Sequence, residues 1–181
     1  MTLSDAMVLT NTVSSPTAFS DGECARYFEL LSSLPEHALV VEVGLQFGRS
    51  SSIALQVCKA NNLCYWGIDS FEEDNDAMHK WIELAEKVGE PYTLSRLRSN
   101  AVIMREPIDL ILIDGDHSYQ GVTDDLNHFM PLVRREGYAL FHDFGRHSLP
   151  EVYSAVRDYM DGNQHWREQE HVETLGIWRR A

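Results

Sequence analysis

The stretch Ile108–Gly121, IDLILIDGDHSYQG, decides the fold class of this chain. An apolar run rich in Ile and Leu ends abruptly at Asp114, and Asp116 and His117 follow directly in the same loop. Apolar runs closed by Gly and Asp are typical of parallel strands that are covered on both faces. Because open α/β sheets bind ligands beyond the carboxyl ends of their strands, the stretch predicts a buried strand that opens into a functional site.

Three other segments repeat this arrangement. Residues 39–44 (LVVEVG) run into a glycine-containing turn, and residues 65–69 (YWGID) end in an acid. Residues 138–143 (YALFHD) end in His142 and Asp143. Four strands are therefore predicted to deliver polar side chains to one rim of a sheet.

Helical patterns alternate with these strands. Ser20 and Glu23 have the spacing of a capping box and predict the start of a helix. Further helices are predicted over residues 50–60, about 77–88, 122–130 and 150–159, with a short one around residues 100–104. A short third strand is predicted over residues 91–97, and two antiparallel closing strands over residues 165–171 and 173–179. This alternation predicts an α/β fold with a mostly parallel sheet.

Length and composition favour one domain. The chain has 181 residues, and residues 1–19 lack sustained periodicity, so we expect a mobile or loosely docked N-terminal arm followed by a folded domain over residues 20–181. The formal net charge of −13 would repel phosphate backbones and anionic membranes, so we expect neither a nucleic-acid nor a membrane partner. No apolar stretch approaches the roughly 20 residues of a membrane span, and a cytoplasmic location is expected. Cys24, Cys58 and Cys64 show no pairing pattern and predict buried, reduced thiols.

The first strand leads into a loop with the pattern Glu42-x-Gly44-x-x-x-Gly48-x-Ser50. Glycines at such a place let a ligand approach the backbone, and the following helix offers free N–H groups. A nicotinamide-binding loop would have the pattern G-x-G-x-x-G, but Leu45 and Gln46 stand where its middle glycine belongs. Asp69 ends the next strand and is a candidate for binding ribose hydroxyls, with a structural or solvated role as the alternative.

Four motifs, in this order and at these spacings, resemble one enzyme family. They are VVEVGLQFGRSS (residues 40–51), YWGIDSF (65–71), IDLILIDGDHSYQGVTDDL (108–126) and GYALFHDF (137–144). Together they are similar to the class I S-adenosylmethionine-dependent methyltransferases, and in particular to a small subgroup with an IDGDHSY motif that includes metal-assisted O-methyltransferases of sugars and natural products. The resemblance covers residues 39–145 well and implies a Rossmann-like, seven-stranded sheet in the order 3-2-1-4-5-7-6.

The resemblance also implies a set of contacts for S-adenosylmethionine. The loop from Gly44 to Gly48, with Ser50 at the following helix, would pass under the methionine part, and Glu42 would support its amino group directly or through water. Asp69 would bind the ribose hydroxyls.

The adenine would lie further along the same rim. Ser70 and Phe71 would flank it, and Ser99 or Asn100 would meet its edge. Phe71 has the alternative role of a core residue, and Ser99 and Asn100 that of capping a helix.

The second half of the chain carries the candidates for methyl-acceptor chemistry. His117 has an ordinary pKa of about 6.5, which suits a general base, and the resemblance gives it this role beside Asp114. Its alternative role is to cap the next helix or to form a hydrogen bond with a backbone carbonyl. Asp114 and Asp143 should end neighbouring strands about 4.8 Å apart, so that their carboxylates could converge on a divalent ion such as Mg²⁺ or Mn²⁺. Related metal-dependent enzymes usually place two successive acids at the second position, whereas this chain has His142 and Asp143, so that His142 is either a third ligand or a core residue.

The leading hypothesis is therefore an S-adenosylmethionine-dependent methyltransferase acting on a hydroxyl of a small molecule. An S-adenosylmethionine-binding protein without transfer activity and a nicotinamide-dependent oxidoreductase are the alternatives. Because the chain has little sequence for a lid, residues 1–35, residues 71–75 or a second subunit of a homo-oligomer are expected to complete the acceptor pocket.

Overall fold

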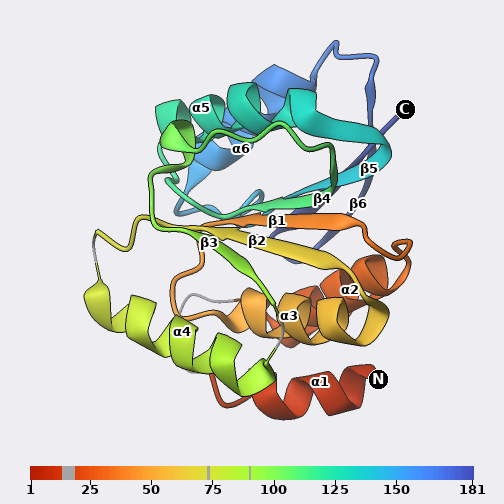
Figure 1. The fold of residues 1–181 in the computed structure, drawn as a ribbon. Coiled ribbons are helices and arrows are strands. Elements are labelled where there is room, and N and C mark those ends of the chain that lie inside the picture. Colours follow the sequence, from red (N-terminus) through yellow and green to blue (C-terminus); the bar gives the residue numbers. More distant parts are fainter. Residues whose placement is uncertain (14–18, 73, 90) are drawn as a thin grey trace.

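A seven-stranded sheet in the order β3-β2-β1-β4-β5-β7-β6 forms the centre of the computed structural model (Figure 1). The structure describes residues 1–13, 19–72, 74–89 and 91–181. The strands are β1 (Leu39–Val43), β2 (Cys64–Ile68), β3 (Thr93–Ser95), β4 (Ile108–Ile113), β5 (Val133–Phe141), β6 (Trp166–Val172) and β7 (Leu175–Arg180). The first five strands are parallel to one another, and β7 is antiparallel to both β5 and β6. The predicted fold class and strand order are confirmed.

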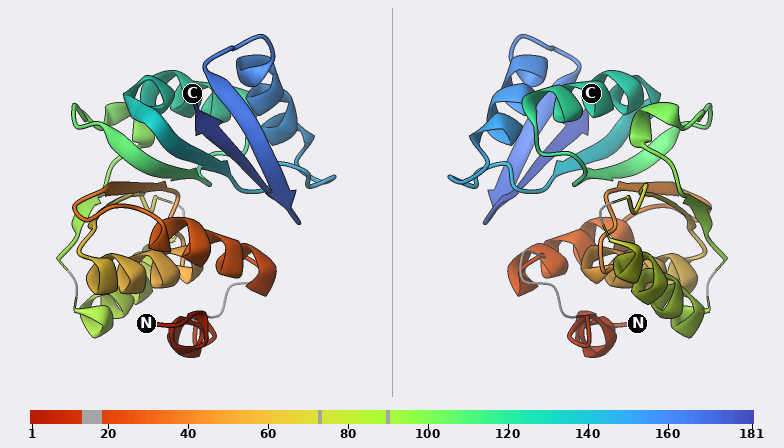
Figure 2. Two further views of the ribbon diagram at one scale, coloured as in Figure 1. Left: turned by 90° about the vertical axis from the view of Figure 1, so that its right-hand side faces the viewer. Right: turned by 90° about the vertical axis from the view of Figure 1, so that its left-hand side faces the viewer.

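Helices cover both faces of the sheet (Figures 1 and 2). One face carries α1 (Leu3–Thr10), α2 (Asp21–Ser32), α3 (Arg49–Asn61) and α4 (Asn75–Val88), and the other carries α5 (Tyr119–Phe129) and α6 (Pro150–Met160). Two short 3₁₀ helices, η1 (Ser99–Ala101) and η2 (Met130–Leu132), precede β4 and β5. Each layer encloses its own apolar core, with Tyr27 and Trp81 buried on the first side and Phe129 and Trp178 on the second. All six residues of β4 are buried, as expected for a central strand covered on both faces.

The N-terminal segment, where we expected a mobile or loosely docked arm, contains a helix that the sequence patterns did not predict. Residues 3–10 form helix α1, and a capping box between Thr2 and Asp5 begins it. The helix packs on α3 through the small buried residues Ala6 and Thr10, and the Thr10 Oγ1 atom lies 2.7 Å from Ser52 Oγ. Small residues add little to an apolar pattern, which explains why this helix was not predicted. Residues 14–18 of the predicted arm lie outside the described residues.

The remaining predicted elements occur with shifted ends. The capping box of α2 is confirmed, because Ser20 Oγ accepts from the Glu23 N–H at 3.1 Å and Glu23 Oε2 accepts from the Ser20 N–H at 2.8 Å. Helix α4 begins at Asn75, two residues earlier than predicted, and the third strand is shortened to three residues. The helix expected around residues 100–104 is the 3₁₀ helix η1.

The carboxyl ends of the parallel strands meet at one edge of the sheet. Val43 pairs with both Ile68 and Ile113, and Ile113 pairs with Phe141. The polar residues that follow these four positions therefore share one edge. Within the described part of the chain, no helix is long and apolar enough to span a membrane.

Candidate active site

The loop between β1 and α3 requires glycine at two positions. Gly44 has a φ of +84°, and a Cβ atom there would lie 2.0 Å from the carbonyl oxygen of Asp114. Gly48 has a φ of +85° at the N-cap of α3, where a Cβ would lie 2.7 Å from the side chain of Leu84. The first glycine thus lets the β1 loop touch the end of β4, which brings the predicted cofactor loop against the predicted acceptor residues.

Asp69 holds this loop in place. Its Oδ2 atom accepts hydrogen bonds from the backbone N–H groups of Leu45 at 2.8 Å and Gln46 at 3.1 Å, and its Oδ1 atom accepts from the Phe71 N–H at 2.7 Å. Because a carboxylate oxygen can accept two hydrogen bonds, Oδ1 retains room for a hydroxyl donor, whereas Oδ2 has none. The sequence predicted that Asp69 binds the ribose hydroxyls of the cofactor. The structure shows that Asp69 also anchors the loop.

Glu42 lies beneath the loop and is fully buried. Its two oxygens accept from the hydroxyls of Ser50 and Tyr65. Burial, the largest influence, raises the pKa of Glu42 to about 7, although the hydrogen bonds from Ser50, Tyr65 and Ser51 act in the opposite direction. Glu42 and Ser50 were both predicted to contact the cofactor. In the structure they form a hydrogen bond with each other inside a buried polar cluster.

The four residues predicted to surround the adenine lie in two places: Ser70 and Phe71 follow β2, and Ser99 and Asn100 lie on η1. Ser70 is half-buried beside Asp69, whereas Phe71 is only 4% exposed and packs in the core, with a φ of +51°. Its alternative role as a core residue is the one that the structure supports. Ser99 and Asn100 lie on η1, and Asn100 is exposed.

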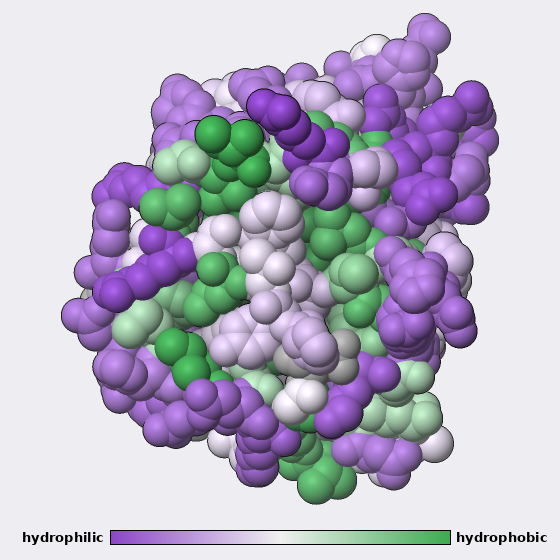
Figure 3. Space-filling view, viewed as in Figure 1, coloured by the Kyte–Doolittle hydropathy of each residue, from purple (hydrophilic) through white to green (hydrophobic). Residues whose placement is uncertain are grey.

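The face of the molecule drawn in Figure 3 carries both apolar and hydrophilic side chains. Figure 3 shows apolar and neutral side chains between the two helix layers and hydrophilic side chains around them. Leu97 and Ile103, on either side of η1, are 49% and 82% exposed.

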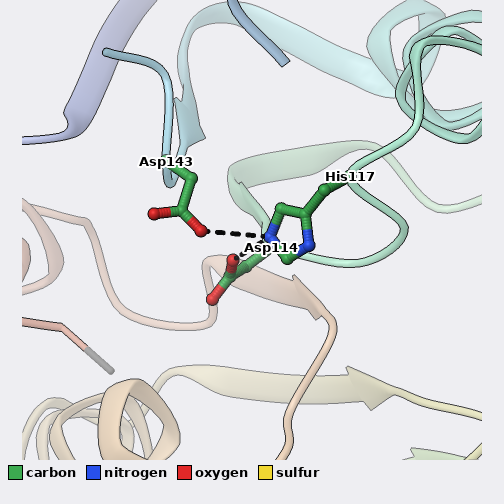
Figure 4. A group of neighbouring side chains, drawn as sticks. All are labelled: Asp114, His117 and Asp143. Atoms are coloured by element: carbon green, nitrogen blue, oxygen red, sulfur yellow. Dashed lines mark hydrogen bonds and ion pairs between the residues drawn. The ribbon is translucent and has the colours of Figure 1, made fainter. Parts of the chain in front are cut away.

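His117, Asp114 and Asp143 converge at the ends of β4 and β5 (Figure 4). The Nε2 atom of His117 lies 3.3 Å from Asp114 Oδ1 and 3.2 Å from Asp143 Oδ2. Hydrogen bonds to these two carboxylates raise the pKa of His117 to about 9, against the opposing effect of burial. The structure thus brings together the predicted base and two of the three predicted metal ligands.

His142, the third predicted metal ligand, lies behind this group. It is 4% exposed, its ring stacks on Phe19 at 4.7 Å between centroids, and its Nδ1 atom lies 3.1 Å from Asp114 Oδ1. Its Nε2 atom faces Glu23 Oε2 at 3.5 Å. Burial lowers the pKa of His142, but the hydrogen bonds to Asp114 and Glu23 outweigh it and raise the pKa to about 10. Both ring nitrogens therefore face carboxylates.

Sequence reasoning missed the role of Glu23. Its Oε1 atom accepts from both the N–H (2.9 Å) and the hydroxyl (2.7 Å) of Thr174, in the turn between β6 and β7. Burial raises the pKa of Glu23, but hydrogen bonds from His142, Ser20 and Thr174 lower it to about 2. The capping-box pattern identified Glu23 as a helix start, and no pattern linked it to residues more than 100 positions away.

Arg146 is a second residue that the sequence did not single out. Its Nη1 atom lies 3.0 Å from Asp143 Oδ1, and Asp143 has a left-handed φ of +57°. Burial raises the pKa of Asp143, but the interactions with His117, His142 and Arg146 bring it below its ordinary value. Asp116 is exposed and accepts from the Ser118 N–H at 2.9 Å, so it supports the turn before α5.

Comparisons with known proteins agree with the fold and identify a family. Residues 41–144, more than half of the chain, match the family described as methyltransferase domain. The O-methyltransferase TomG from Streptomyces achromogenes, involved in tomaymycin synthesis and solved with S-adenosylmethionine, superimposes with a TM-score of 0.70 at 13% identity, over 99% of this chain and 89% of that one. A TDP-rhamnose 3'-O-methyltransferase of calicheamicin biosynthesis does so with a TM-score of 0.70 at 13% identity, over 97% and 93%.

A shorter likeness exists at the level of sequence. A stretch of 50 residues is 42% identical to an uncharacterized protein of Acanthamoeba polyphaga mimivirus. The match covers 27% of this chain and 23% of that protein, so it spans less than a quarter of the relative's length. The family match and the strand order together support one conclusion: the chain belongs to the methyltransferase domain family and has the fold of the class I S-adenosylmethionine-dependent methyltransferases.

Proposed function

We propose that this protein transfers the methyl group of S-adenosylmethionine to a hydroxyl group of a small molecule. One observation carries the proposal: the glycine loop after β1 lies against the end of β4, where His117 is held between Asp114 and Asp143. A cofactor on the loop and an acceptor beside His117 would thus be neighbours. TomG and the TDP-rhamnose enzyme are both O-methyltransferases, which supports the choice of oxygen as the acceptor atom.

S-adenosylmethionine supplies a methyl group that its sulfonium already activates, so the protein's task is to place the acceptor and remove its proton. The carbon–oxygen bond forms as the carbon–sulfur bond breaks, and the hydroxyl proton passes to His117. Asp114 and Asp143 orient the imidazole, and the imidazolium that forms is stabilised by the same two carboxylates. Because these contacts raise the pKa of His117 to about 9, the neutral, basic form becomes more abundant as the pH rises toward that value.

The Mg²⁺ or Mn²⁺ ion implied by the family resemblance is a separate question. Asp114, His117 and Asp143 offer ligand atoms within 4.8 Å of one another, and two oxygens with one nitrogen are suitable donors for a divalent ion. However, Asp114 Oδ1 is shared by two imidazoles, and the two oxygens of Asp143 face His117 and Arg146. In this arrangement the residues satisfy one another and do not fit a cation, so the proposed transfer uses protein groups alone.

The first test is calorimetric titration of the purified protein with S-adenosylmethionine, with NADH as the control ligand. Binding of S-adenosylmethionine alone, followed by formation of S-adenosylhomocysteine with a panel of hydroxyl compounds, is the expected result. Failure to bind S-adenosylmethionine would contradict the proposal. Binding without transfer to any acceptor would favour the alternative of a cofactor-binding protein.

A further inference from the structure

Six charged side chains form an alternating row through the acceptor site. The row crosses from the N-terminus of α2 to the loop after β5, and each carboxylate in it lies next to at least one base. Its members, in order, are Glu23, His142, Asp114, His117, Asp143 and Arg146.

His142 is fixed in the middle of this row. Its side chain is 3% exposed, and stacking on Phe19 sets the plane of its ring. The Nδ1 atom faces Asp114 at 3.1 Å and the Nε2 atom faces Glu23 at 3.5 Å. Since a carboxylate can only accept hydrogen bonds, both ring nitrogens must carry a proton to satisfy both neighbours. The buried ring is then a cation without a free electron pair for a metal.

Glu23 is equally well fixed. Thr174 holds one of its oxygens with two hydrogen bonds, and the backbone of Ser20 holds the other. Its carboxylate can therefore not turn away from His142 without breaking contacts to α2 and to the turn between β6 and β7. These contacts make the Glu23–His142 pair a rigid part of the fold.

The row also balances its charges. It contains the carboxylates of Glu23, Asp114 and Asp143 and the bases His117, His142 and Arg146. A divalent ion added to this row would compete with the imidazolium of His142 for Asp114 Oδ1, which lies 3.1 Å from His142 Nδ1, and two cations on one half-buried oxygen repel each other.

We propose that His142, held by Glu23, is a positioning residue that takes the place of a divalent ion: it gives Asp114 its positive partner and keeps metal ions out of the acceptor site. The inference rests on the proposed function only in naming this the acceptor site. It follows that exchanging the ring for a carboxylate should create a metal site that the natural chain lacks.

The experiment measures binding of Mn²⁺ alone to the full chain by electron paramagnetic resonance near neutral pH. The test variant is Glu23→Gln/His142→Asp, in which the amide avoids a clash of two carboxylates. His147→Asp, at an exposed position five residues after His142, controls for a new surface acid. Binding of S-adenosylhomocysteine is measured on every variant, so a failure of the proposed function is seen separately from a failure of this inference.

We expect no saturable Mn²⁺ binding by the natural chain or the control below about 1 mM, the weak end of protein divalent-ion sites. The double variant is expected to bind at least about tenfold more tightly, the scale on which residues around a metal site change its affinity. Addition of Asp114→Asn to the double variant should abolish the gain.

Saturable Mn²⁺ binding by the natural chain that Asp143→Asn removes would overturn the inference. A folded double variant that binds no better than the natural chain would also overturn it, since His142 would then not be what excludes the ion. If the double variant does not fold, the Mn²⁺ titration of the natural chain still decides: absence of saturable binding supports the inference and its presence overturns it.

Discussion

Glu42→Gln should change how the stability of the protein depends on pH. Glu42 is fully buried, and its pKa is raised from the ordinary 4.5 to about 7 in the folded chain. Between these values the folded state keeps a proton that the unfolded state has lost, so stability falls as the pH rises and is constant above about pH 7. Since one pKa unit corresponds to about 1.4 kcal/mol, Glu42 alone should remove about 3 kcal/mol of stability across this window.

The measurement is urea unfolding of both proteins at a series of pH values from about 4.5 to 7.5, the window set by the two pKa values. Asp125, whose pKa burial raises to about 6, titrates in the same window in both proteins, so only the difference between the two curves is interpreted. The natural chain should lose about 3 kcal/mol relative to Glu42→Gln as the pH rises. Glu36→Gln, on the exposed surface, controls for the loss of a carboxylate. A difference that stays constant over the window would refute the reasoning.

Three further predictions concern the candidate site and the docking of helix α1. Gly44→Ala should abolish binding of S-adenosylmethionine in calorimetry, because its Cβ would collide with the Asp114 carbonyl at 2.0 Å; unchanged affinity would contradict the close contact of loop and strand. Arg49→Met should raise hydrogen exchange in α1, because Arg49 donates to the carbonyls of Thr10 at 3.2 Å and Phe19 at 2.6 Å, and equal exchange rates would show that α1 is held by other contacts. His117→Asn should lower methyl transfer by about 10²-fold or more with unchanged cofactor binding, the usual contribution of a general base. In the natural chain the transfer rate should rise with pH toward the pKa of about 9, and a rate that falls over this range would argue against His117 as the base.

The parts of the fold that the sequence predicted are those with strong patterns. The apolar run of β4 and the polar residues at the strand ends led directly to the sheet and to the group of His117, Asp114 and Asp143, because parallel strands must end at a common edge. Helix α1 escaped prediction because its two fully buried residues, Ala6 and Thr10, are small and form no strong apolar pattern.

Two of the missed site residues, Glu23 and Phe19, share a physical cause. Glu23 and Phe19 reach His142 from a segment more than 100 positions away. Only the packing of the start of α2 against the turn between β6 and β7 brings them there. His142 itself was placed at the right edge, but its orientation depends on these distant partners. A strand-end pattern gives the position of a side chain and leaves the direction of its polar atoms to the tertiary structure.

The stacking of Phe19 on His142 has a practical consequence for anyone who produces this protein. A fragment that begins at Ser20, where the sequence patterns suggest that the domain starts, would lack the aromatic ring that covers the imidazole and the carbonyl that Arg49 binds. Such a fragment would retain the whole sheet, yet the buried ring of His142 would lose its cover on one side. Work on activity should therefore keep the chain intact from Met1 and carry any purification tag at the other terminus.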